Sequence, residues 1–205
     1  MKTRTISAVL ILMVLAVSCI PSLYPLYREK DLIFDDRLTG RFDIDGDIWE
    51  FERLDWNQEN YLSNDWDQFR SGKTYKLIAW EDSKRAEFAV HLIKLKNNYY
   101  LDFFPVRYEI NHEFLYWHLI PAHIFGKIEF VENDVTINWF DGDFLMNMID
   151  SNKMKISHKM LEEGILLTAK TEELQKFVKK FGDNPGAYID QDPDTLYHIA
   201  GTFKL

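Results

Sequence analysis

The sequence predicts a mainly β, β-rich α+β fold: an antiparallel barrel or half-barrel with one or two helices near its carboxyl end. Between Gly40 and Trp139, short segments of alternating apolar and polar residues follow one another, separated by turn residues. Strands that turn one face towards a core show this period of two. After Trp139 the apolar spacing changes to three and four residues, which is typical of amphipathic helices.

Turn residues divide the first part of the chain into strands. Asp45-Gly46 is a strong signal for a two-residue hairpin turn, and Asn97-Asn98 and Asn133-Asp134 predict the turns of two later hairpins. Residues 55–72 are polar and are predicted to form a long loop. The segments predicted as strands are 41–44, 48–54, 73–80, 85–96, 99–104, 113–125, 127–132 and 135–140.

Four residues are expected to disturb these strands. Ile93 and Leu95 break the alternation of their segment, which predicts a β-bulge there. Pro105 is expected to end its strand, because proline cannot donate a hydrogen bond to a neighbouring strand. For the same reason, Pro121 predicts a bend or an edge within 113–125.

The clearest helix covers 171–181. Thr171 is expected to cap it, Lys179 and Lys180 stand in its last turn, and Gly182 follows it. A second helix is predicted over 143–151, with Asp141 or Asp143 as its cap. Two further strands are predicted over 153–160 and 164–169, and a closing strand over 196–203.

An opening of the form Leu-x-Gly-x-aromatic, here Leu38, Gly40 and Phe42, precedes the strands. Together with about eight antiparallel strands and a late helix, this opening resembles the lipocalin fold and predicts a lipocalin-like barrel. A β-sandwich and an open α+β sheet stay possible alternatives.

The amino-terminal segment has the features of an export signal. Lys2 and Arg4 precede a short apolar run over 6–17, which is too short to span a bilayer of about 30 Å. The order Leu15-Ala16-Val17-Ser18-Cys19 resembles a bacterial lipobox, which implies cleavage after residue 18 and lipidation of Cys19. The alternative is an ordinary secretory signal. The expected organisation is a signal peptide over 1–18, an extended lipid-anchored tether over 19–36 and one globular domain over 37–205.

The words PSLYPLY at 21–27, EKDL at 29–32 and FD at 34–35, followed by Leu38 and Gly40, resemble the mature amino-terminal ends of a family of uncharacterised bacterial lipoproteins. Weaker likeness continues through 118–125 and 167–177. The resemblance implies a place in the cell envelope and no assigned activity. Phe42 stands where the family has tryptophan.

Charge and cysteine content limit the possible partners. Residues 1–18 contain Lys2 and Arg4 and no acidic residue, so cleavage would change the formal charge from −9 to −11. Such a chain repels nucleic acid and anionic membrane surfaces, so attachment would rest on the lipid at Cys19. Cys19 is the single cysteine, which excludes an internal disulfide. Ile20 rather than aspartate follows it, which favours the outer membrane.

No motif specifies a reaction, so we expect neither an enzyme nor a cofactor. G-x-S-x-G, GxGxxG and GxxxxGK are all missing from the sequence. Residues 43–47 resemble the start of a calcium loop, but Leu54 occupies its twelfth position, where a glutamate is needed. We expect solvated or structural roles for the acidic loop at 190–194 and for His112, His118 and His123, and therefore no metal site.

Same-face aromatic residues on successive strands form the candidate ligand pocket. A barrel of eight strands can be filled by its side chains or can hold one small apolar or amphiphilic ligand. The other candidate function is an envelope protein–protein interaction module with a filled core and an exposed patch around Trp56, Tyr61, Trp66 and Phe69. The candidate pocket residues are Trp49, Phe51, Tyr75, Phe88 and Phe103.

Overall fold

The computed structural model describes residues 19–54, 69, 71–81, 84–107, 119–162, 164–189 and 193–200. The signal peptide predicted over 1–18 lies outside the described residues, as does most of the loop predicted over 55–72. None of the described helices is long and apolar enough to cross a membrane.

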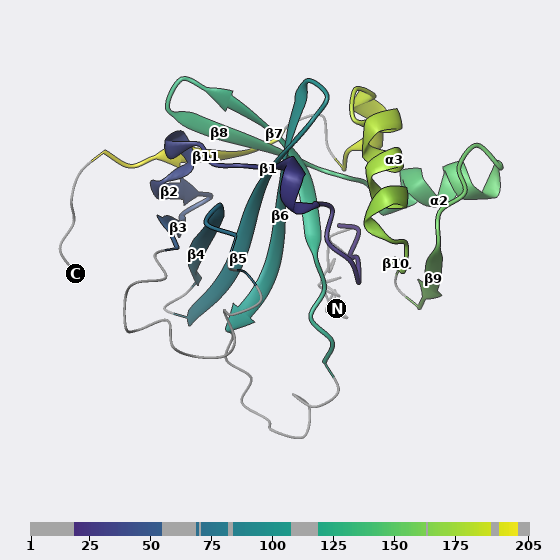
Figure 1. Ribbon diagram of the computed structural model, residues 1–205, viewed down its shortest axis with the longest axis horizontal. Coiled ribbons are helices and arrows are strands. Elements are labelled where there is room, and N and C mark those ends of the chain that lie inside the picture. Colours follow the sequence, from purple (N-terminus) through teal and green to yellow (C-terminus); the bar gives the residue numbers. More distant parts are fainter. Residues whose placement is uncertain are drawn as a thin grey trace, which may run out of the picture.

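Eight antiparallel strands form a closed barrel, which confirms the predicted fold class (Figure 1). Each strand pairs with the next along the chain, and the last one pairs with both β8 and β2 and so closes the barrel. The barrel is therefore an up-and-down meander without a free edge. Its strands are β2 (Gly40–Ile44), β3 (Asp47–Arg53), β4 (Thr74–Glu81), β5 (Lys84–Leu95), β6 (Asn98–Arg107), β7 (Ile124–Val131), β8 (Asp134–Trp139) and β11 (Asp194–His198).

Residues with positive φ mark the hairpin turns. Asp45 (φ 53°) and Gly46 (φ 94°) form the predicted β2–β3 turn, so this segment is a hairpin and not a calcium loop. The two later turns lie one residue earlier than predicted, because Lys96 (φ 57°) and Glu132 (φ 56°) take the left-handed conformation. Strand pairing accordingly resumes at Asn98 and Asp134.

The predictions for the middle of β5 and the end of β6 were wrong. Ile93 and Leu95 continue the regular strand on the outer face of the barrel, where other elements bury them. The irregularity lies at Glu87, which pairs with Arg107 while the next residue pairs with Pro105. Pro105 therefore lies beside a bulge, where a missing N–H is tolerated, and β6 continues to Arg107.

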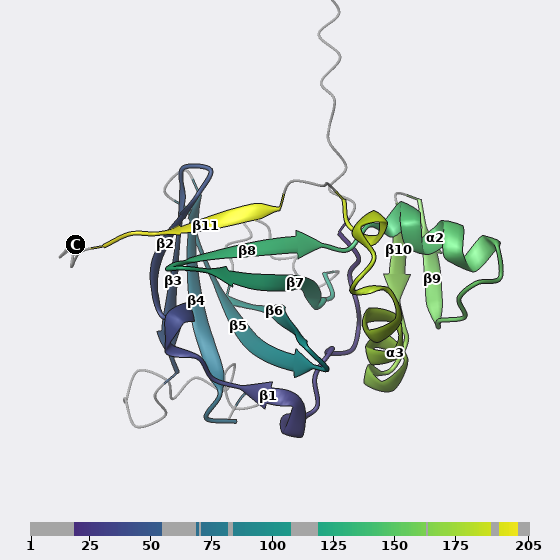
Figure 2. The same cartoon turned by 90° about the horizontal axis from the view of Figure 1, so that it is seen from above.

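A second group of elements packs beside the barrel, on its right in Figures 1 and 2. It contains α2 (Gly142–Asp150), α3 (Thr171–Phe181) and the separate hairpin of β9 (His158–Leu161) and β10 (Gly164–Leu167). The bounds of α3 are those predicted. Its N-cap is Lys170, however, because the Thr171 hydroxyl donates to the carbonyl of Pro25 (2.8 Å) instead of capping the helix.

Gly182 is the C-cap of α3, and close packing requires a glycine at this position. Its φ is −62°, so no left-handed conformation is required there. A Cβ at this position would collide with the hydroxyl of Tyr100 and with the carbonyl oxygen of Val178. Glycine thus lets the end of α3 approach β6 closely.

The segment predicted as an extended tether is extended, but it packs on the body along its length. Ile20, Leu26 and Leu32 are all buried between the barrel and α3. Leu32 and Ile33 form the short strand β1, which pairs with β5 just beyond the last β4 pair (Thr74–His91). This segment is therefore part of the folded body from its first described residues.

Candidate functional site

The candidate pocket residues face the interior of the barrel and belong to one apolar cluster. Phe51 and Tyr75 are fully buried, whereas Trp49 and Phe88 are only partly buried. The ring centroids of Trp49 and Phe103 are 5.8 Å apart. The structure thus places the five candidate pocket residues in one cluster, but their side chains differ in how deeply they are buried.

The partly buried members gather at one end of the barrel. Trp49 stands just after the β2–β3 turn, Phe88 lies near the start of β5, and Trp139 ends β8. The ring of Phe103 joins them, since it lies 5.6 Å from that of Trp139 and 5.8 Å from that of Trp49. We call Trp49, Phe88, Phe103 and Trp139 the aromatic end.

Trp139 was missed among the predicted pocket residues, although Val135, Ile137 and Trp139 alternate and share a face. Gly126 makes room for its ring, because a Cβ there would come within 3.1 Å of the Trp139 Cε3 atom. The Trp139 indole N–H donates to the carboxylate of Asp194 (2.6 Å). One oriented polar group therefore lies beside the aromatic end.

The opposite end of the barrel is capped by the chain that leads into β2. Phe34 stacks on Tyr75 with ring centroids 4.5 Å apart, and the Tyr75 hydroxyl donates to the carbonyl of Asp35 (3.0 Å). Burial raises the pKa of Tyr75 well above its ordinary value. Leu38 is fully buried, and the Arg37 guanidinium lies 4.0 Å from the centre of the Phe130 ring. The barrel is thus filled and covered at this end.

Cys19, the predicted lipidation site, lies near the aromatic end. Its backbone forms a bridge with Asp141, two residues after Trp139. Burial, and secondarily the negative charge of Asp194, raises the pKa of the Cys19 thiol to about 11. An unmodified Cys19 would therefore stay protonated and unreactive at neutral pH.

A buried polar cluster lies on the outer face of β5 and β6, beneath the amino-terminal segment. The two oxygens of Asp102 accept from Leu26 N–H (2.7 Å) and contact His123 Nδ1 (2.6 Å). His91 Nε2 lies 3.0 Å from the Thr74 hydroxyl, and the His91 ring packs 4.1 Å from that of Tyr27. The sequence did not reveal this cluster, because outward-facing polar residues on a strand are normally solvated.

This arrangement resembles the Asp–His part of a catalytic triad but has no nucleophile among the described residues. The Ser22 hydroxyl donates to the carbonyl of Tyr24 (2.8 Å), and the Thr74 hydroxyl to that of Phe69 (2.7 Å). No described hydroxyl lies within hydrogen-bonding distance of His123. The cluster instead fastens the amino-terminal segment to the barrel.

Glu87 is another buried ionisable group of the outer face. Its carboxylate lies 2.6 Å from Arg85, 3.7 Å from Arg107 and 3.8 Å from Lys76. Three cations around one carboxylate offset the loss of its hydration, so this group is explained as a structural ion cluster.

The residues considered for metal binding do not form a site within the described part of the chain. His112 and His118 lie outside the described residues, as do Asp190 and Asp192, while His123 is paired with Asp102. Across the described ranges, no three histidine, cysteine, aspartate or glutamate side chains come together as metal ligands would.

Three surface hollows are polar and open, unlike a site for an apolar ligand. One of about 480 Å³ lies between the segment Met154–Ser157 and the Glu173 and Lys176 side chains of α3. Two others, of about 390 and 420 Å³, share Lys127 and Glu129. None of the three is lined by a residue of the aromatic end.

No protein-family model, no curated protein and no solved structure matches this chain. Fold and geometry therefore define it only as a closed eight-stranded barrel with an apolar interior, in agreement with the lipocalin-like prediction.

Proposed function

We propose that this protein is a lipid-anchored protein of the bacterial cell envelope, at the outer membrane, that binds a small apolar or amphiphilic molecule at the aromatic end of its barrel. The observation that carries the proposal is the difference between the two ends. The rings of Trp49, Phe88 and Trp139 are partly exposed at one end. At the other end the segment before β2 packs on the barrel, through the fully buried Leu38 and a partly exposed Phe34 that stacks on Tyr75. Large, partly exposed apolar surfaces on a rigid scaffold are common features of ligand sites.

The chemistry of this end indicates the class of ligand. Four aromatic rings form this end, and the Asp194 carboxylate, which accepts a hydrogen bond from Trp139, lies beside it. A carboxylate at the rim repels a second carboxylate, so a neutral or cationic polar end is favoured over a free fatty acid. Sterol-like and other neutral amphiphiles fit this pattern.

The other candidate function is an envelope interaction module without a ligand. The filled centre of the barrel favours it, because Phe51, Tyr75 and Leu77 are fully buried and the Phe42 and Phe51 rings lie in edge contact, with centroids 5.8 Å apart. However, the structure gives little support for the exposed patch that was expected to bind a partner. Phe69 is only 5% exposed and packs against Phe104, while Trp56, Tyr61 and Trp66 lie outside the described residues.

Phe88→Arg is expected to abolish most co-purification of lipid while leaving the barrel folded. The substitution places a charge among apolar rings, which disfavours an apolar ligand. The measurement is native mass spectrometry after gentle detergent extraction, supported by lipid extraction of the same sample. Val131→Arg, at an exposed site (51%) in the β7–β8 hairpin, is the matched control and should keep the lipid. Wild-type protein that is free of lipid but captures one envelope partner would end the ligand proposal.

Cys19→Ala is expected to move the protein from the membrane fraction to the soluble fraction. Acyl chains on Cys19 are the proposed attachment, and the described helices provide no spanning segment. Cells that express the wild type or the variant are fractionated, and the two are compared by immunoblot. Equal membrane association of the two proteins would place the anchor elsewhere.

A further inference from the structure

The anchor residue is joined to the folded body without a spacer. Cys19 pairs with Asp141, Ile20 is 3% exposed, and Ser22 exchanges two backbone hydrogen bonds with His123, both 2.8 Å long. An acyl group on Cys19 would therefore hold the body directly against the bilayer in one orientation. A flexible tether would have allowed many orientations.

We propose that the surface around Cys19 is a membrane-docking face whose occupant is the neutral lipid surface of the bilayer. This inference rests on the lipid anchor of the proposed function and adds an orientation to it. Six of the eight large hydrophobic side chains that are exposed in the described part of the chain lie on the amino-terminal segment or on the two segments whose backbones pair with it. They are Leu23 (39%), Tyr24 (44%), Leu119 (45%), Ile120 (78%), Met160 (55%) and Leu161 (50%).

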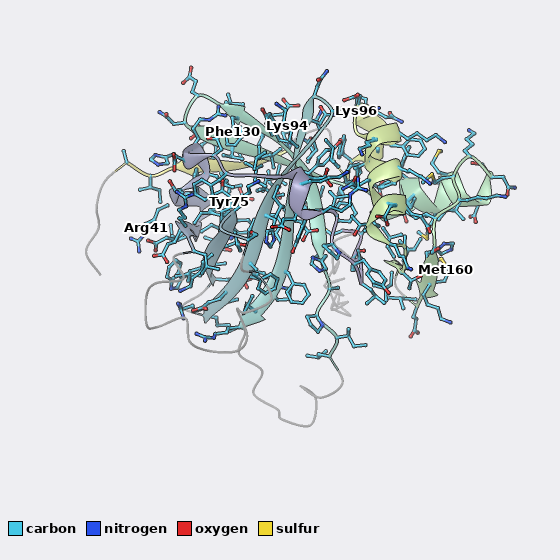
Figure 3. All side chains as sticks on the ribbon, viewed as in Figure 1. Arg41, Tyr75, Lys94, Lys96, Phe130 and Met160 are labelled. Atoms are coloured by element: carbon cyan, nitrogen blue, oxygen red, sulfur yellow. The ribbon has the colours of Figure 1, made fainter. Side chains whose placement is uncertain are left out.

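Backbone hydrogen bonds join the segments that carry these side chains to the amino-terminal segment that begins at Cys19. Leu119 and Ile120 stand just before His123, whose backbone pairs with that of Ser22. Leu23 N–H donates to the carbonyl of Leu167 in β10 (2.9 Å), and Met160 and Leu161 end β9 in the same hairpin. The start of the described chain and this hairpin lie side by side in both Figures 1 and 2, and Met160 projects outwards in Figure 3.

Another exposed apolar residue lies far from this face. Val131 is at the β7–β8 turn, and β8 separates it from Asp141 by seven residues, or about 20 Å of strand. Val131 thus serves as an internal control for contact with lipid. The formal charge of −9, which becomes −11 when Lys2 and Arg4 are removed with residues 1–18, opposes binding to anionic lipids, so the relevant surface is a neutral one.

The docking face also includes the neighbourhood of the aromatic end. Cys19 pairs with Asp141, two residues after Trp139, whose indole N–H donates to Asp194. A ligand that dissolves in the bilayer would then reach the aromatic end without crossing bulk water.

The test uses the full-length lipidated protein on neutral phosphatidylcholine vesicles. Because Cys19 is the single cysteine and is consumed by the lipid, Ile120→Cys, Leu161→Cys and Val131→Cys each offer one thiol for an environment-sensitive fluorophore. We expect blue-shifted emission and several-fold stronger quenching by nitroxide-labelled lipids at 120 and 161 than at 131. Circular dichroism confirms that each variant is folded.

The possible outcomes distinguish a failure of the docking face from a failure of the proposed lipid anchor. Protein that floats with the vesicles but shows equal quenching at all three sites has an anchor and no docking face, which overturns the inference alone. Protein that does not float with the vesicles lacks the anchor, which overturns both. Loss of lipid co-purification in Phe88→Arg concerns the ligand site and changes neither result.

Discussion

Phe177→Ala is expected to lower the free energy of unfolding by about 3–5 kcal/mol. Phe177 lies on α3, is fully buried, and packs against Phe140 and Phe181 with ring centroids 5.1 and 5.7 Å away. Its removal leaves a cavity between α3 and the barrel that these rigid neighbours cannot fill. Urea unfolding followed by circular dichroism measures the effect.

The matched control for this prediction is Lys176→Ala, one residue earlier on the exposed side of α3. It is expected to change stability by no more than about 0.5 kcal/mol. Lys179 is a poorer control, because its ammonium donates to Gln175 (3.1 Å). Equal small effects at 176 and 177 would mean that α3 does not pack on the barrel in solution.

Acidification is expected to destabilise the protein through His91 by about 3 kcal/mol between pH 6.5 and pH 4. His91 is 1% exposed, and its Nδ1 has no hydrogen-bond partner among the described residues. Burial, and secondarily the neighbouring His123, lowers its pKa from 6.5 to about 4, while Asp102 opposes this change. The unfolded chain therefore binds a proton that the folded protein does not, and stability falls as the pH decreases through this window.

His91→Phe isolates this contribution. The variant keeps an aromatic ring, which cannot be protonated, and Thr74 keeps its hydrogen bond to the carbonyl of Phe69. Urea unfolding of the wild type and the variant at pH 7 and pH 4.5 gives the loss of stability for each, and carboxylates common to both cancel in the comparison. The wild type should lose about 2–3 kcal/mol more than His91→Phe. The same loss in both proteins would show that His91 is not buried in its neutral form.

The sequence and the structure differ most clearly on the outer face of β5. In the sequence, Ile93 and Leu95 predict a bulge because they break a one-sided alternation. The strand is in fact regular, and these residues are buried because α3 and the amino-terminal segment cover that face. The residues that cover this face of β5 are distant in the chain, so the order of apolar and polar residues within the strand cannot reveal them.

For the candidate site, too, the sequence predicted one part and the tertiary structure decided the other. Alternation selected Trp49, Phe88 and Phe103 correctly as interior residues of the barrel. The alternation could not distinguish these residues from Phe51 and Tyr75, which are fully buried. The exposure of an interior residue depends on its depth in the barrel and on the end that the segment before β2 covers.

The sequence by itself determined the mainly β class, the β2–β3 turn at Asp45-Gly46 and the bounds of α3, since these depend on residues within a few positions of one another. Only the tertiary structure decided that β11 closes the barrel, that the amino-terminal segment is packed from Cys19 onwards, and that Asp102 is buried with His123. The physical reason is the range of the interactions. Turn and helix preferences are local free energies, whereas strand partners, burial and the pairing of buried charges depend on contacts between distant parts of the chain.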